Sequence, residues 1–269
     1  MINQTNQALR SAESPFDFRL FQPEGSLAHY VQGIWSASVP ATPEKNMTKW
    51  LQADACSGIM FILAGSVEFD GIPYSAKALL LPISKQAHTI MLSSGTQVAG
   101  VRFQPGISVD ILRTQFEQSV AQQDNKQQRW LQLMASRLQY TPHHQARITA
   151  LYKWLNNTVD ICQCIPASVL RCLQVIQNAN NNQLSKSGML LSQRQIERQF
   201  QKWVGISPKQ CQRILRVKKT IEHLKHKPNS NLVTLALDYG FSDQSHMTRE
   251  FAQIAKITPK RYCKRIASK

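Results

Sequence analysis

Two stretches of the chain are diverged copies of one another: SQRQIERQFQKWVGISP at Ser192–Pro208 and SDQSHMTREFAQIAKITP at Ser242–Pro259. Ser192 corresponds to Ser242 at an offset of 50 residues, and the other matches lie at an offset of 51, which we explain by a one-residue insertion. The other matches pair Arg198 with Arg249, Phe200 with Phe251, Ile206 with Ile257, Ser207 with Thr258 and Pro208 with Pro259. A repeat of this size indicates one supersecondary unit used twice.

Each copy has the pattern of a polar N-cap, an amphipathic helix and a turn into a second helix that starts with Ser/Thr-Pro. In the first copy Ser192 is the N-cap, and Ile196, Phe200 and Trp203 share one helix face. The side chains left facing outward are Gln193, Arg194, Glu197 and Arg198.

The second copy follows a short helix that we expect to end at Gly240, because glycine favours the left-handed conformation after a helix. Ser242 or Asp243 caps the next helix. Its inward residues are Met247, Phe251 and Ile254, and its outward residues are Gln244, Ser245, Thr248 and Arg249. The arrangement predicts a helix-turn-helix.

Arginine and glutamine dominate both outward faces, and their side chains can pair bidentately with guanine and adenine edges in the major groove. A solvated polar face is the alternative interpretation. Between the copies, Ser207-Pro208 begins a long helix that runs to about His226 and fixes the separation of the two units. We divide its basic residues between phosphate contacts and solvent: Arg213, Arg216, Lys218, Lys219 and Lys225.

The charge of the chain is unevenly distributed. Residues 161–269 hold 19 basic and 5 acidic residues, a net charge of +14, whereas residues 1–160 carry only +2. A half this basic favours a polyanionic partner. The longest apolar-rich run, Gly58–Val67, is too short to span a membrane, and six cysteines do not resemble a disulfide scaffold. We therefore expect a soluble, unexported cytoplasmic protein with reduced thiols.

The first half of the chain predicts a β-domain. From Phe16 to about Ser108, short apolar or alternating runs are separated by turn residues, which indicates a compact β-sandwich or barrel. The expected strands are Tyr30–Val39, Gly58–Ala64, Ser66–Phe69, Ala78–Pro82, His88–Leu92 and Val98–Phe103. The fold class is thus α+β, with a β-domain at 1–109, a helical connector at 110–160 and a DNA-binding domain at 161–269.

Two apolar stripes with helical spacing mark the connector: Leu131, Met134, Ala135 and Leu138, followed by Ile148, Leu151, Tyr152 and Leu155. Such a helical pair can pack on the β-domain, on the DNA-binding half or on the same pair in a second subunit. A hairpin within the chain is the preferred interpretation.

The C-terminal motifs resemble the AraC/XylS family of bacterial transcription regulators. The motifs Gly205-Ile206-Ser207-Pro208 and Gly240-Phe241-Ser242-Asp243-Gln244-Ser245 stand in the order and spacing of that family, and the resemblance covers roughly Pro166–Lys269. It implies an all-α double helix-turn-helix joined by a long helix, binding double-stranded DNA. The base-facing positions that it implies are Arg194, Glu197, Arg198, Gln244, Ser245, His246 and Arg249.

The first half resembles the subgroup of these regulators with a cupin-like N-terminal domain, through the segments Leu27–Trp35 and Gly100–Gly106. The resemblance implies effector sensing or dimerisation. We expect a small-molecule effector pocket lined in part by Trp35, Trp50, Phe61 and Phe103. RNA polymerase is a further partner, the chain acts as a homodimer or a monomer, and no cofactor or metal is expected.

Some positions depart from the family pattern. Lys186 and Leu190 replace alanine and glycine in an Asn-rich segment before the first copy, so we expect the helix of the first copy to be less well supported. Replacing Arg249 should therefore weaken DNA binding more than replacing Arg198. Cys211 replaces an aromatic residue, and Lys256 stands where glycine is common.

Three other functions compete with this interpretation. A metal-dependent cupin enzyme with a basic helical appendage would need more ligands beside His88. Zinc could bind the thiols of Cys162, Cys164, Cys172 and Cys211. RNA binding fits the charge, but the chain shows neither an aromatic strand motif nor a basic Gly-x-x-Gly loop. We favour a non-enzymatic DNA-binding regulator.

Overall fold

The structure is a computed structural model that describes residues 16–41, 46–74, 77–107, 129–158, 165–178 and 192–267. The chain divides into two compact units. Unit 1 comprises Met1–Trp50, Ser57–Pro82 and Thr89–Cys164, and unit 2 comprises Leu51–Cys56, Ile83–His88 and Ile165–Lys269. Both copies of the repeat therefore lie in unit 2.

Unit 1 contains two antiparallel sheets. The five-stranded sheet has the order β1 (Asp17–Phe21), β2 (Val31–Ser38), β9 (Gln97–Phe103), β4 (Gly58–Ala64) and β7 (Ala78–Leu81). The four-stranded sheet has the order β3 (Met47–Leu51), β8 (His88–Leu92), β5 (Val67–Phe69) and β6 (Ile72–Tyr74). A 3-10 helix, η1 (Gly25–His29), precedes β2. The predicted sandwich is confirmed, whereas the sheets do not close into a barrel.

A hydrophobic cluster lies between the sheets, with Met60 and Val98 from the larger sheet packed against Val67, Ile90 and Leu92 from the smaller. Alternate residues of each strand point to opposite faces, so the same strands leave a second set of side chains on the outer face. The larger sheet therefore has two apolar faces.

Strands β1, β3 and β6 were absent from the sequence prediction. In the structure Pro73 pairs with Glu68 of β5, and β6 forms the edge of its sheet. Proline is tolerated at an edge because no further strand requires its missing N–H.

The two segments that carry the cupin-like resemblance lie side by side on β2 and β9. Trp35 is opposite Gly100 in the register, and the backbone N–H of Gln104 donates to the carbonyl of Tyr30 (2.7 Å). A Cβ atom on Gly100 would lie 2.6 Å from the Trp35 ring. Glycine is thus required where the indole lies flat on the neighbouring strand.

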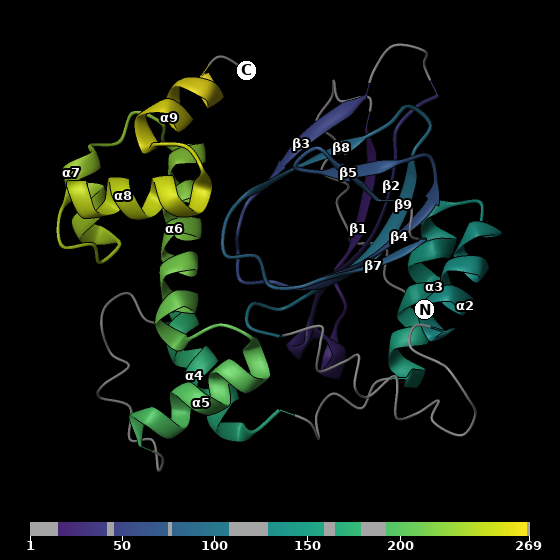
Figure 1. Ribbon diagram of the computed structural model, residues 1–269, viewed down its shortest axis with the longest axis horizontal. Coiled ribbons are helices and arrows are strands. Elements are labelled where there is room, and N and C mark those ends of the chain that lie inside the picture. The colour runs from purple at the N-terminus through teal and green to yellow at the C-terminus, as the bar shows by residue number, and fades with distance from the viewer. Residues whose placement is uncertain are drawn as a thin grey trace. The chain divides into compact units, whose positions relative to one another are not determined.

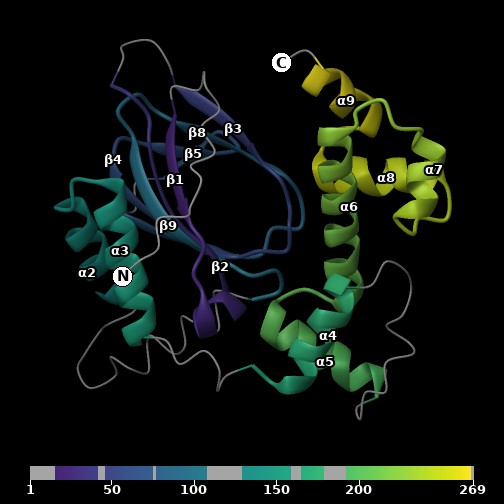
Figure 2. The same ribbon diagram turned by 180° about the vertical axis from the view of Figure 1, so that it is seen from behind.

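Helices α2 (Arg129–Gln139) and α3 (His144–Thr158) cover the outer face of the five-stranded sheet (Figure 2). The side chains of both predicted stripes are buried there, apart from the half-buried Tyr152. Phe61 of β4 meets the ring of Trp154 edge-on. The ring of Trp154 is also stacked on that of Trp130, with 5.6 Å between the ring centroids. Of the three packing alternatives, the structure shows contact with the β-domain.

His144 at the start of α3 connects this helix to the sheet. Its Nδ1 lies 2.8 Å from the hydroxyl of Ser36, and its Nε2 lies 3.6 Å from the carboxylate of Asp17. Burial lowers the pKa of His144, the charge of Asp17 opposes this effect, and Arg147 and Arg19 add to the lowering.

We predict that acidification destabilises unit 1 through His144. Its pKa is lower in the folded protein than its ordinary value of 6.5. As the pH falls, the His144 side chain therefore takes up a proton in the unfolded chain before it does so in the folded protein. The stability that is present above the unfolded pKa is then lost as the pH falls toward the folded pKa. His144→Gln should flatten the decline when urea unfolding is measured from about pH 8 to about pH 5. The neighbouring, exposed His143→Gln is the control; equal slopes for wild type and His144→Gln would contradict the prediction.

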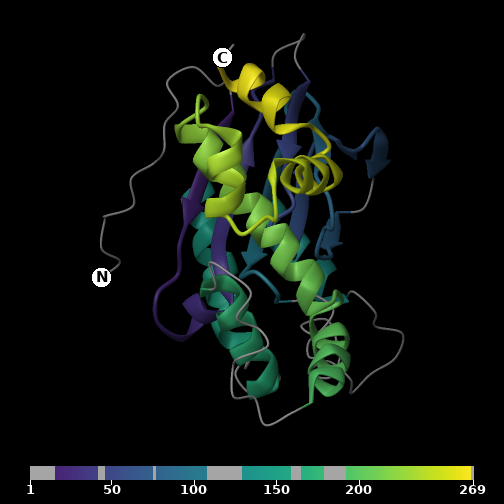
Figure 3. The same ribbon diagram turned by 90° about the vertical axis from the view of Figure 1, so that its left-hand side faces the viewer.

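Unit 2 is helical. It contains α4 (Ala167–Asn178), α5 (Gln193–Val204), α6 (Pro208–His226), α7 (Leu232–Asp238), α8 (Gln244–Ala255) and α9 (Pro259–Ala267). In Figure 1, α4 and α5 lie around the lower part of α6, and α7, α8 and α9 around its upper part. Figure 3 shows the same unit facing the viewer, with α6 running through it.

The predicted long helix is confirmed as α6, which Ser207 caps by accepting from the backbone N–H of Gln210. It packs against α4, α5, α8 and α9. Its buried residues are Pro208, Cys211, Ile214, Leu215, Val217, Thr220, Ile221 and Leu224. One helix therefore supplies core to both copies of the repeat.

Candidate nucleic-acid interface

Helix α5 presents the first outward face. Ser192 and Gln195 form a reciprocal capping box at its start, and Phe200 and Val204 are buried on its inner side. The four side chains predicted to face outward are all exposed: Gln193, Arg194, Glu197 and Arg198. The inner anchors therefore orient a polar face rich in arginine and glutamine toward solvent.

Helix α8 presents the second face. Asp243 is its N-cap, and its carboxylate accepts from the backbone N–H of His246 (2.7 Å). This bond and one from the Ser242 hydroxyl hold the pKa of Asp243 below its usual value. Met247 and Phe251 are buried. Among the residues predicted to face outward, Gln244, Ser245 and Arg249 are exposed and Thr248 is half-buried.

Helices α5 and α8 correspond at one constant offset. Each has 12 residues, and the caps Ser192 and Asp243 are 51 residues apart. The residues that end the helices, Gly205 and Lys256, are also 51 apart, and both have positive φ, 81° and 57°. The pairing of Ser192 with Ser242 was therefore wrong: Ser242 precedes the cap, and the offset of 51 holds along the whole helix without an insertion.

Lys256 adopts the left-handed conformation that glycine adopts without strain. We predict that Lys256→Gly stabilises unit 2 by about 0.5–1 kcal/mol, because relief of about 1–2 kcal/mol of backbone strain exceeds the extra entropy lost by glycine. Denaturant unfolding measures the change. Lys227→Gly is the matched control, because Lys227 also follows a helix but has a φ of −134°. The Lys227→Gly variant should lose about 0.5–1 kcal/mol in its free energy of unfolding. A loss of stability in both variants would contradict the prediction.

Three basic side chains of α6 make internal contacts, which corrects their assignment to phosphate or solvent. Arg213 Nε donates to Glu250 of α8 (2.6 Å), and Arg216 donates to the backbone carbonyl of Gly240 (2.9 Å). Lys219 donates to a backbone carbonyl in the last turn of α4 (3.0 Å). These cations hold the helices that flank α6. Sequence reasoning missed them, although Glu250 is the single acidic residue of α8.

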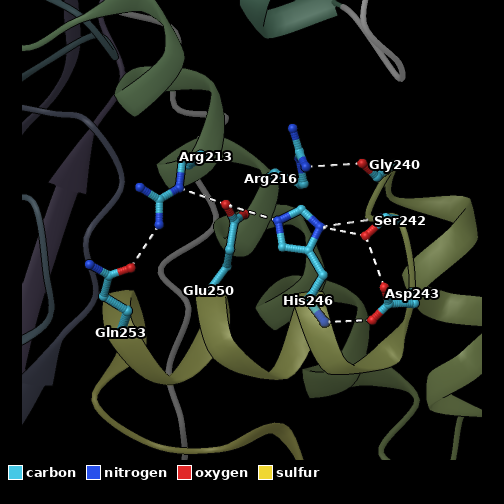
Figure 4. A network of polar contacts seen from close by, with 8 residues as sticks. All are labelled: Arg213, Arg216, Gly240, Ser242, Asp243, His246, Glu250 and Gln253. Atoms are coloured by element: carbon cyan, nitrogen blue, oxygen red, sulfur yellow. Dashed lines mark hydrogen bonds and ion pairs between the residues drawn. The ribbon is translucent and has the colours of Figure 1, made fainter.

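His246, which the family resemblance implies as base-facing, is half-buried at the start of α8. Its ring lies against Glu250 on one side and Ser242 on the other (Figure 4). The imidazole thus differs from the exposed Gln244, Ser245 and Arg249 side chains of the same helix.

The expected effector residues do not share one face of the sheet. They were Trp35, Trp50, Phe61 and Phe103. Trp35 packs on the cluster between the sheets, whereas Phe61 lies against α3. Phe103 is on the same face of β9 as Gln97, whose amide accepts from Arg147 of α3. Trp50 is half-buried on β3 in the other sheet.

The described residues contain no group of three or more His, Cys, Asp or Glu side chains that could hold a metal ion. Burial raises the pKa of Cys172 to about 11 and that of Cys211 to about 12. Cys162 and Cys164 lie outside the described residues, as do Lys186 and Leu190. No helix in the described part of the chain is long and apolar enough to cross a membrane.

Two family models match the chain. A helix-turn-helix domain matches residues 188–265, and a domain of unknown function, DUF6597, matches residues 19–123. No curated protein matches the chain.

Solved structures with similar coordinates include ToxT from Vibrio cholerae O395, with 12% identity, a TM-score of 0.40, and coverage of 84% of this chain and 98% of that chain. ToxT from strain SCE256 bound to an unsaturated fatty acid has 13% identity, a TM-score of 0.38, and coverage of 82% and 96%. KdgF from Halomonas sp. has 10% identity, a TM-score of 0.27, and coverage of 36% and 84%.

The matched helix-turn-helix domain coincides with the two capped helices and their exposed polar faces in the basic half of the chain. The chain is a DNA-binding transcription regulator. Within that class, the motifs at Gly205–Pro208 and Gly240–Ser245 resemble those of the AraC/XylS type.

Proposed function

We propose that this regulator reads two successive major grooves on one side of double-stranded DNA, one with α5 and one with α8. The carrying observation is the equivalence of Arg198 and Arg249. Each arginine lies two residues before the buried phenylalanine of its helix, Phe200 or Phe251, and each is exposed. The same local fold therefore presents the same base-reading side chain twice.

The length of α6 supports this spacing. Its 19 residues extend about 28 Å at 1.5 Å per residue, which is of the same order as the ~34 Å between successive major grooves on one side of DNA. Because buried side chains of α6 serve both halves of unit 2, the separation of the readers is set by one rigid element.

We predict that Arg198→Ala and Arg249→Ala each weaken specific binding by ~1–3 kcal/mol and relax base preference in a different half of the site. Selection of sites from randomised duplexes, followed by affinity measurements at fixed salt, provides the test. The exposed Lys225→Ala on α6 is the control and should leave base preference unchanged. Equal, sequence-independent losses for both arginines would show that they contact only phosphate.

We further propose that the space between the two sheets of unit 1 takes an apolar small-molecule effector. Five inward-facing apolar side chains pack on the central cluster and yet remain only partly buried: Trp35, Ile62, Phe69, Leu79 and Leu81. Partly exposed apolar side chains on facing sheets suit contact with a hydrophobic ligand. Such a ligand would regulate DNA binding only to the extent that it binds the two states of the protein differently.

We predict that an apolar effector raises the Tm of the full chain, and that Leu81→Trp abolishes the rise because the indole fills the space between the sheets. A thermal-shift screen of aliphatic and aromatic metabolites identifies the ligand. Leu133→Trp is the matched control, since Leu133 is 63% exposed on α2. A shift that survives Leu81→Trp would place the ligand elsewhere, and no shift with any compound would favour a role in dimerisation alone.

The remaining partners follow from regulation of transcription. We propose that the chain works in the bacterial cytoplasm, contacts RNA polymerase beside its operator, and binds DNA as a homodimer or a monomer. Sedimentation of the chain with and without a single-site duplex distinguishes the two oligomeric states.

A further inference from the structure

We propose that His246 is a positioning residue of the reader helix α8, and that it acts through Glu250 and Ser242 rather than by touching a base. The inference rests on the proposed function of α8 and assigns a different role to one of its side chains. It is carried by the contacts on the two ring nitrogens of His246 and by the burial of Glu250.

Glu250 is an acidic side chain buried in a basic unit, with 7% of its surface exposed. Its Oε1 accepts from Arg213 Nε at 2.6 Å and lies 3.3 Å from His246 Nε2. Its Oε2 is buried without a hydrogen-bond partner in the part of the chain that the structure describes. A carboxylate in such a place depends on its two cationic or N–H neighbours, which therefore lock its position.

The opposite side of the imidazole binds the turn before α8. The backbone N–H of Ser242 points at His246 Nδ1 (3.3 Å), and the Ser242 hydroxyl lies 3.1 Å from the same nitrogen. A backbone N–H can only donate, so Nδ1 is the acceptor and the ring proton is on Nε2, where it is donated to Glu250. The Ser242 N–H at Nδ1 and the Glu250 carboxylate at Nε2 together assign one tautomer.

A second route connects the ring to α6. Phe241 meets the His246 ring edge-on, with centroids 5.7 Å apart and planes at 86°. The guanidinium of Arg216 lies over the Phe241 ring, 5.1 Å from its centroid. Arg213 and Arg216, three residues apart on α6, thus reach the same imidazole. Arg213 does so through Glu250 (Figure 4), and Arg216 through Phe241.

These contacts form a network that connects α6 to the first turns of α8, where Gln244 and Ser245 are exposed. Both nitrogens of His246 are engaged inside the protein, which leaves neither for a base edge. The network instead fixes the rotation of α8 about its own axis, and this rotation determines where the exposed side chains of α8 point.

The test compares wild type with three variants in site selection from randomised duplexes. His246→Gln keeps a donor near the Nε2 position, His246→Asn keeps an acceptor near the Nδ1 position, and His246→Ala keeps neither. We expect all three to select the same bases as wild type. The Ala variant should lose about tenfold in specific affinity, with preference weakened over the whole half-site read by α8, and the other two variants should lose less.

Loss of preference at one base pair, with the rest of the half-site intact, would make His246 a base reader and overturn the proposal. Long-range 1H–15N NMR of the wild-type chain should show the proton on Nε2, and a proton on Nδ1 alone would also overturn it. If the Ala variant does not fold, the Gln and Asn variants carry the test. A wild-type chain that selects no sequence would overturn the proposed function and this inference with it, whereas an altered base preference overturns only the inference.

Discussion

The burial of one face of α6 is the constraint on which unit 2 depends. Alternate turns of this helix supply Cys211, Ile214 and Leu224 to the cores around it, and its half-buried cations reach the flanking helices. Neither copy of the repeat therefore has an independent core. The positions of α5 and α8 relative to each other follow from side chains on a single rigid element, as the proposed reading of two successive major grooves requires.

Local features of the fold were predictable because they depend on residues close in sequence. The Ser207 cap, the buried Phe200 and Phe251 and the apolar stripes of α2 and α3 follow from spacing within one or two turns. The pair Arg213 and Glu250 was not, because 37 residues separate them and only tertiary packing brings them together. The same limit explains the expected effector residues. The sequence pattern placed Trp35, Phe61 and Phe103 in strands and missed the strand of Trp50, and the assignment of strand faces to the helices or the second sheet needs the three-dimensional arrangement.

In unit 1 the two faces of the five-stranded sheet have different partners. The outer face is covered by α2 and α3, with fully buried Phe61 and Leu151, whereas the inner face retains partly exposed side chains such as Leu79 and Leu81. The close contact of Trp35 with Gly100 lies on this inner face. The outer face of the sheet, with α2 and α3, is thus tightly packed, and the inner face has accessible apolar surface. A ligand on the inner face could contact side chains there without disturbing the helices on the outer face.

The internal use of basic side chains in α6 has a consequence for the ionic strength at which the regulator works. Counterions are released from DNA only by cations that reach phosphate, and the guanidinium of Arg213 is neutralised by Glu250 within the protein. Arg216 and Lys219 are likewise held by backbone carbonyls. The number of ions displaced on binding is therefore smaller than the net charge of +14 implies, and the affinity falls less steeply with salt than it would for a surface with the same cations all exposed.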